Sequence, residues 1–131
     1  MPDPTPCLDA IGIVSRDLPE SVRFYRLLGL PFPDATPGED HLEAKAPSGV
    51  RVMLDAVELI RKITPDYVAP HGHRIGLAFH CGDAAGVDAT FARILAAGFE
   101  GKKTPWDAFW GQRYAQIADP DGNLIDLFAP L

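Results

Sequence analysis

An acidic residue and a basic residue of the C-terminal half could form a polar ligand anchor. Arg74 opens one expected strand, and Asp126 lies in the middle of another, 124–128. Because side chains alternate along a strand, Leu124, Asp126 and Phe128 share one face. A carboxylate between two apolar side chains indicates a cavity rather than open solvent. Arg74 with Asp126 could hold a polar or anionic group bidentately, or could simply be a structural ion pair.

Aromatic residues gather just before the expected strand 113–118. Trp106, Phe109 and Trp110 lie within five residues of one another. Their flat rings could form a wall on which a planar ligand stacks. The alternative is that they cap a core or form a dimer contact.

The N-terminal half offers fewer candidates. On the expected strand 50–56, Met53 and Asp55 share a face opposite Val52 and Leu54. The predicted ligand-binding set combines residues of both halves: Arg74, Asp126, Asp55, Met53, Trp106, Trp110 and Phe128.

No nucleophilic catalytic arrangement of Ser, His and Asp or of Cys and His is recognisable. Cys7 and Cys81 have no metal-binding spacing, and they are expected to be reduced thiols in a cytoplasmic protein. His41, His71 and His80 are scattered, and we interpret them as surface or loop residues.

Sequence patterns place these residues on a simple order of elements. Asp17 and Asp83 predict two helix starts, and Gly29 and Gly98 predict their ends. Residues 56–63 fit either a strand or a short helix, and 64–72 read as a linker. The expected strands cover 8–14, 41–46, 50–56, 74–80, 113–118 and 124–128.

The two halves echo each other. Ile11-Gly12-Ile13 corresponds to Ile75-Gly76-Leu77, and each half contains a strand, a capped helix, a Gly stop and further strands. The prediction is one α+β domain over 1–131, made of two β-α-β-β-β repeats at about 8–63 and 73–131.

Composition limits the classes of partner. The chain has 131 residues, 47% of them hydrophobic, and a formal net charge of −6. This acidity argues against nucleic acid and suits cationic or neutral small molecules. No apolar run approaches the roughly 20 residues of a membrane helix. We therefore expect a soluble domain without nucleic-acid or membrane partners.

Three stretches give the chain a family resemblance over nearly its whole length. They are Asp17-Leu18 through Phe24-Tyr25 to Leu28-Gly29-Leu30, then Trp110-Gly111-Gln112-Arg113, then Asp119-Pro120-Asp121-Gly122-Asn123 with Ile125-Asp126-Leu127. With the repeat, they resemble the vicinal oxygen chelate superfamily of glyoxalases, extradiol dioxygenases and bleomycin-resistance proteins. The resemblance implies a curved mixed sheet around a shared cavity, and a homodimer.

The resemblance also implies four positions where the enzymes of that superfamily hold a divalent metal. Here they fall on Ala10, on Met53 or Asp55, on Arg74, and on Asp126. A divalent ion about 4 Å from a guanidinium would be repelled by roughly 8 kcal/mol at an effective dielectric near 20. The guanidinium cannot lose its proton to relieve this repulsion. The expectation is therefore a site without metal.

The leading interpretation is a metal-free small-molecule-binding protein of the bleomycin-resistance type, which sequesters a partly planar ligand. The alternative is a metal-dependent lyase, isomerase or dioxygenase. In that case a bulge would turn His73 inward to join Asp55 and Asp126 around Zn, Ni, Fe or Mn. A third possibility is a dimeric interaction module whose cavity is filled by its own side chains.

Overall fold

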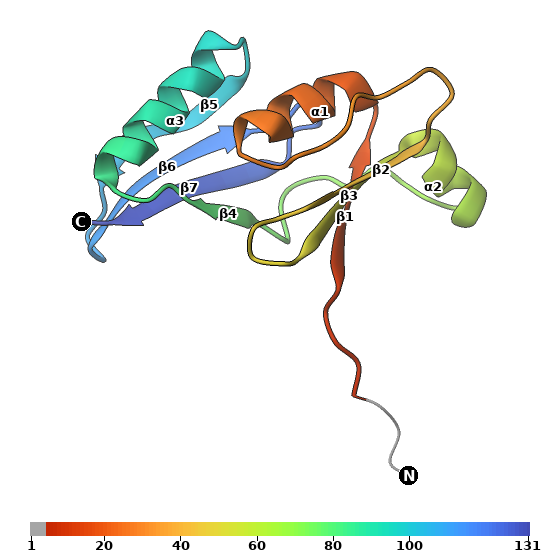
Figure 1. The fold of residues 1–131 in the computed structure, drawn as a ribbon, viewed down its shortest axis with the longest axis horizontal. Coiled ribbons are helices and arrows are strands. Elements are labelled where there is room, and N and C mark those ends of the chain that lie inside the picture. The colour runs from red at the N-terminus through yellow and green to blue at the C-terminus, as the bar shows by residue number, and fades with distance from the viewer. Residues whose placement is uncertain (1–4) are drawn as a thin grey trace.

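The chain folds into two sheets covered on one side by helices, as the computed structural model of residues 5–131 shows (Figure 1). One sheet has the strand order β1-β3-β2, and the other β4-β7-β6-β5. The pairs β1/β3 and β4/β7 are parallel, and the others are antiparallel. The elements are β1 (Ala10–Ser15), α1 (Leu18–Leu27), β2 (His41–Lys45), β3 (Arg51–Ala56), α2 (Val57–Ile63), β4 (Leu77–His80), α3 (Ala84–Ala96), β5 (Glu100–Asp107), β6 (Gln112–Ala118) and β7 (Leu124–Pro130).

Both long helices begin and end where the sequence predicts. The Asp17 carboxylate accepts from the Glu20 amide, and the Asp83 carboxylate accepts from the Gly86 amide. Gly29 and Gly98 follow the two helices with φ of 87° and 91°, a backbone conformation that side chains oppose. The capped-helix prediction is confirmed in both halves.

The first repeat departs from the predicted strand count. Residues 57–63, for which strand and helix both fitted, form the short helix α2. Val57, Ile60 and Ile63 recur at a helical spacing, and Val57 is buried. The first sheet therefore has three strands and the second has four.

The predicted strand 74–80 is wrong in its first three residues, because β4 begins at Leu77. Leu77 pairs with Ile125, so a partner for Arg74 would have to stand three residues earlier, at Gly122. Gly122 lies in the turn before β7, with φ of 88°, and so it cannot continue the strand pairing between β4 and β7. Ile75, expected on the apolar face, is 83% exposed.

The core lies between the helices and one face of each sheet. Its largest fully buried side chains come from both helices and both sheets: Phe24, Tyr25, Leu54, Ile94, Ile117, Ile125 and Leu127. The alternate residues of each strand face away from the helices. No helix among residues 5–131 is long and apolar enough to cross a membrane.

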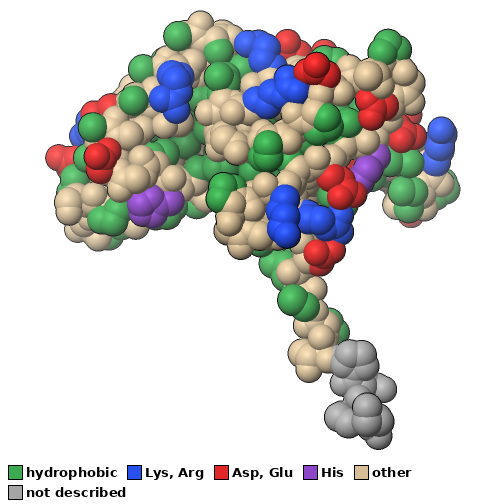
Figure 2. Space-filling view, in the orientation of Figure 1, with side chains coloured by type: hydrophobic (Ala, Val, Ile, Leu, Met, Phe, Trp, Pro, Cys, Tyr) green, Lys and Arg blue, Asp and Glu red, His purple; other side chains and the backbone are tan. Residues whose placement is uncertain are grey.

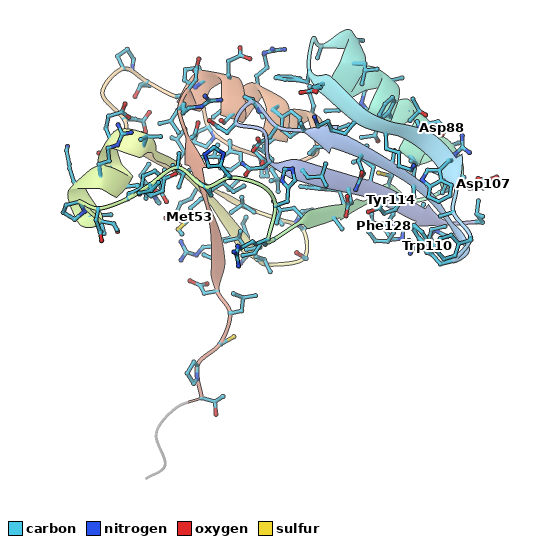
Figure 3. All side chains as sticks on the ribbon, turned by 180° about the vertical axis from the view of Figure 1, so that it is seen from behind. Met53, Asp88, Asp107, Trp110, Tyr114 and Phe128 are labelled. Carbon is cyan, nitrogen blue, oxygen red and sulfur yellow. The ribbon has the colours of Figure 1, made fainter. Side chains whose placement is uncertain are left out.

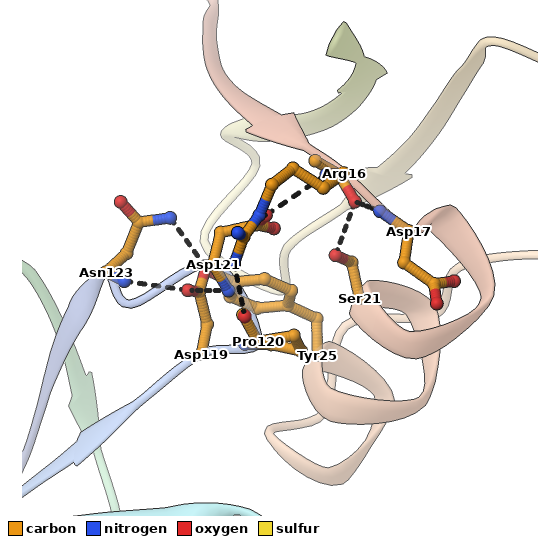
Figure 4. A network of polar contacts seen from close by, with 9 residues as sticks. Arg16, Asp17, Ser21, Tyr25, Asp119, Pro120, Asp121 and Asn123 are labelled. Atoms are coloured by element: carbon orange, nitrogen blue, oxygen red, sulfur yellow. Dashed lines mark hydrogen bonds and ion pairs between the residues drawn. The ribbon is translucent and has the colours of Figure 1, made fainter. Parts of the chain in front are cut away.

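A buried carboxylate fastens the turn before β7 to α1 (Figure 4). Asp119 is only 4% exposed and accepts the Tyr25 hydroxyl at 2.7 Å. It also accepts the backbone amides of Asp121 and Asn123 and the Asn123 side-chain amide. Arg16 binds Asp121 at 2.9 Å, so both sides of the turn are tied to the first repeat.

Candidate functional site

An aromatic row crosses all four strands of the second sheet on the face turned away from the helices. In the strand register His80 lies beside Phe128, Phe128 beside Tyr114, and Tyr114 beside Trp106. The residues between them along β6 and β7, such as Ala115 and Leu127, are fully buried in the core. Strand alternation therefore places the four rings together on the outer face. We call these four residues the aromatic row.

The rings of this face contact one another edge to face. The ring centroids of His80 and Phe128 are 5.1 Å apart. Trp110 lies 5.2 Å from Tyr114 and 5.6 Å from Trp106, which extends the row at the β5–β6 hairpin. Figure 3 shows Trp110, Tyr114 and Phe128 gathered at this end of the sheet. The structure thus brings together three of the predicted residues, Trp106, Trp110 and Phe128.

Polar groups border the aromatic row. In the neighbouring register row Ala78 lies beside Asp126, and Asp126 beside Gln116. The Gln116 side-chain amide donates to the Asp126 carboxylate at 3.0 Å. Among residues 5–131 no basic side chain forms an ion pair with Asp126. Ala78 is too short to cover the carboxylate from the β4 side.

The Tyr114 hydroxyl is held protonated at the border of the two rows. Burial raises the pKa of Tyr114 to about 12, and the neighbouring Asp126 carboxylate adds to the shift. The phenol, which is protonated at neutral pH even with its ordinary pKa of 10.0, thus stays a hydrogen-bond donor into more alkaline solution. Buried Trp106 Nε1 has no hydrogen-bond acceptor within the part of the chain that the structure describes. A donor buried without an acceptor is uncommon and costs free energy.

The first sheet carries a different, charged outer face. His41 is paired with Asp55 across β2 and β3, with Nδ1 2.5 Å from the Asp55 carboxylate. Its Nε2 lies 2.7 Å from Glu43, which also binds Arg51 at 2.6 Å. The two carboxylates, Asp55 first, raise the pKa of His41 above its ordinary value of 6.5. The His41 side chain is 37% exposed, as a surface residue should be, but the sequence did not predict its two carboxylate partners.

Met53 and Asp55 lie on this charged face, as predicted, but on the first sheet. Figure 3 shows Met53 well away from the aromatic group of the second sheet. A Cβ on Gly12 would come within 3.6 Å of Asp55 Oδ2 and 3.5 Å of Met53 Cε. These are ordinary van der Waals distances, so a Cβ at position 12 would fit beside both side chains.

Arg74 and His73 lie before β4 and are exposed. Their predicted orientations relied on strand alternation, which does not reach them. Arg74 makes no ion pair with Asp126 among residues 5–131, and Gln116 donates to Asp126 instead.

The alternative metal set is not assembled. No group of three His, Cys, Asp or Glu side chains able to hold a metal is found among residues 5–131. Asp55 lies on β3 and bonds to His41, Asp126 lies on β7, and His73 precedes β4. These three residues therefore do not fit a metal site.

Two hollows lie on other parts of the surface. One, of about 390 Å³, is lined by residues around the start of α1 and the loop 35–39. The other, of about 300 Å³, lies between α1, β4 and α3. Neither is lined by a predicted ligand-binding residue, although His80 of the aromatic row borders the second.

Sequence reasoning missed His80, Tyr114, Gln116 and His41. Tyr114 and Gln116 alternate with buried Ala115 and Ile117 along β6, so their shared face with Asp126 was open to prediction from period-two spacing. The pairing of His80 with Phe128 had no local signal, because residues 80 and 128 are distant in the sequence.

Comparison with known proteins identifies the class. The sequence model of the glyoxalase/bleomycin resistance protein/dioxygenase superfamily matches residues 8–127, and the chain belongs to this superfamily. No curated protein matches the sequence.

Solved structures share the fold. A glyoxalase/bleomycin resistance protein/dioxygenase from Nocardioides is 28% identical, with 99% of this chain and 87% of that one covered and a TM-score of 0.75. Lactoylglutathione lyase from Agrobacterium tumefaciens is 20% identical over 97% and 96% of the two chains, with a TM-score of 0.69. TioX from Micromonospora sp. ML1 is 21% identical over 96% and 100%, with a TM-score of 0.63.

Proposed function

We propose that this protein binds a small, partly planar molecule on the aromatic row of the second sheet, without a metal. The observation that carries the proposal is the row itself, His80, Phe128, Tyr114 and Trp106, which spans four strands outside the core. These rings lie outside the core and so are not required to fill it, whereas a flat ligand could stack on them.

Stacking alone is too weak to give useful affinity. Burying about 150 Å² of apolar ligand surface contributes roughly 4 kcal/mol. Lost translational and rotational freedom costs at least about 4 kcal/mol. The affinity must therefore come from polar contacts beside the rings.

Asp126 is the proposed polar anchor. One of its oxygens accepts from Gln116, and the carboxylate keeps further lone pairs for a ligand donor. Hydrogen bonds to a charged group contribute about 1.5–3 kcal/mol. Because stacking only offsets the lost translational and rotational freedom, this contribution makes binding favourable. The ligand is therefore expected to carry N–H or O–H donors, or a positive charge, next to its planar part. Arg74, which is exposed before β4, would contact only an anionic group of the ligand, if the ligand carries one.

Tryptophan fluorescence tests this function. Chelator-treated protein would be screened against planar heteroaromatic compounds that carry an amine or amidine. Binding should quench emission, weaken about tenfold or more in D126N through loss of the charged acceptor, and persist in D66N. Asp66 is an exposed loop residue and serves as the matched control. Binding that needs added Zn²⁺, Ni²⁺, Fe²⁺ or Mn²⁺ would contradict the proposal and favour the metal-enzyme alternative.

We also propose that the protein works in the cytoplasm as a homodimer. The dimer is supported by Phe109 at the β5–β6 hairpin, which is 91% exposed, next to Trp110 at 47%. Light scattering on the intact protein tests the dimer, and a concentration-independent monomer would refute it.

A further inference from the structure

A second site candidate lies on the helix side of the molecule. It is the hollow of about 300 Å³ between the end of α1, the end of β4 and α3. Arg26 lines it from α1, and Arg93 and Thr90 line it from α3. Cys81, the residue after β4, lines it as well. The proposed function makes no use of these four residues.

The hollow is positively charged in an acidic protein. Two guanidiniums line it, and none of its lining residues is Asp or Glu. The other hollow provides the contrast, because Arg16 there is accompanied by Asp17, Glu39 and Glu58. Figure 2 shows positive and negative side chains interspersed over one face of the molecule, the usual arrangement for a soluble surface. Two arginines around a hollow without a carboxylate depart from that arrangement.

Arg93 keeps most of its donors free. Its Nη2 donates to Thr90 Oγ1 at 3.3 Å, and it forms no ion pair within residues 5–131. Thr90 is only 9% exposed. A buried hydroxyl thus fixes the guanidinium at the wall of the hollow, and its other N–H groups remain available.

Arg26 is fixed by neighbours on its other side. Its Nε donates to the Phe32 carbonyl at 2.8 Å, and its Nη2 binds Asp34 at 2.7 Å. Asp34 is 86% exposed on its side chain, and so exposed a pair contributes about 0–1 kcal/mol. An incoming anion can therefore compete for this guanidinium.

Two smaller effects act on an anion in the hollow. The carboxyl end of α1 carries about half a negative charge, which opposes binding. The two guanidiniums outweigh it. His80 also lines the hollow, and its Nδ1 accepts the Gly82 amide at 3.0 Å, so the neutral ring has its proton on Nε2 as a further donor.

We propose that this hollow binds a small oxyanion, a phosphate, sulfate or carboxylate group, through Arg93 and Arg26. The planar guanidinium fork matches such groups bidentately. The site shares His80 with the aromatic row, but Arg93 and Arg26 take no part in the proposed function, so either proposal can fail without the other.

Cys81 gives the site its own reporter. In alkylation by iodoacetate, the Cys81 thiolate forms the S–C bond as the C–I bond breaks and iodide leaves. Iodoacetate carries a carboxylate and iodoacetamide does not, so the ratio of their rates measures attraction of an anion to the hollow. Exposed Cys7 is the internal control, and mass spectrometry of the intact protein's peptides reads both sites.

The rate ratio at Cys81 should exceed that at Cys7 by about threefold or more, since a cationic cleft concentrates anions. Arg93→Gln should remove this preference, Arg93→Lys should keep part of it, and Arg61→Gln on α2 should leave it unchanged. Inorganic phosphate or acetate should suppress it more than chloride at equal ionic strength, and the stronger competitor identifies the anion class. Equal ratios at the two cysteines, no effect of Arg93→Gln in a folded variant, or equal competition by chloride would overturn the proposal.

Discussion

His41 shows how one residue can respond to pH in this molecule. It lies between Asp55 and Glu43, and these carboxylates raise its pKa above 6.5. Because the folded-state pKa is raised, the stability that protonated His41 contributes is fully present below 6.5. It is lost as the pH rises through the folded-state value.

An NMR titration of the His41 ring tests this pairing. The midpoint should lie above 6.5 in the native protein and fall in D55N, because Asp55 makes the largest contribution. A His41 midpoint unchanged by D55N would show that the pairing is absent in solution.

The buried Asp119 carboxylate leads to a second prediction at this scale. Burial is the main cause that raises the pKa of Tyr25, with Asp119 next, so its hydroxyl stays a donor throughout the accessible pH range. Tyr25→Phe removes the donor and should lower the free energy of unfolding by about 1–3 kcal/mol, since the acceptor stays buried.

Urea denaturation measures this loss. Tyr67→Phe is the matched control, because no side-chain hydrogen bond of Tyr67 is found among residues 5–131, and it should change stability by less than about 0.5 kcal/mol. Equal stabilities of the two variants would mean that the Tyr25–Asp119 bond contributes nothing.

At the scale of elements, α3 depends on a glycine in its first turn. A Cβ on Gly86 would lie 2.0 Å from the Cys81 carbonyl oxygen, which is backbone and cannot swing away. Gly86→Ala should therefore destabilise the fold by about 1–3 kcal/mol, despite a helix preference for Ala of up to about 1 kcal/mol.

Comparing the melting temperatures of Gly86→Ala and Gly76→Ala separates the steric clash from the general effect of replacing Gly by Ala. Nothing lies within 4 Å of a Cβ on Gly76, so the same chemical change there should leave the melting temperature nearly unaltered. A Gly86→Ala protein as stable as the native one would refute the close approach of α3 to Cys81.

Elements with local signals were predictable, and those set by distant partners were not. The carboxylate caps Asp17 and Asp83 and the stops at Gly29 and Gly98 all act within one turn of helix, so the sequence alone located both long helices. The start of β4 depends on where its partner β7 begins, about fifty residues later in the chain. The alternation of side chains at 74–76 therefore could not show that the strand begins only at Leu77.

At the scale of the whole molecule, the superfamily fold was predictable and the site only in part. The repeat and the Asp-Pro-Asp-Gly-Asn turn predicted two sheets, which the family match and the fold confirm. The prediction that Arg74 points into the cavity required residues 74–76 to be part of β4, but β4 begins at Leu77. The aromatic row depends on the register of β4, β7, β6 and β5, which no single strand reveals.

The most direct test of ligand binding on the aromatic row is a ¹⁵N–¹H correlation spectrum of chelator-treated protein, titrated with the tightest compound of the fluorescence screen. The Nε1–H signals of Trp106 and Trp110 and the amides of Tyr114 and Phe128 should shift together, while those of Met53 and Asp55 on the first sheet move little. Shifts confined to other residues, or seen only after a divalent metal is added, would contradict metal-free binding on this face.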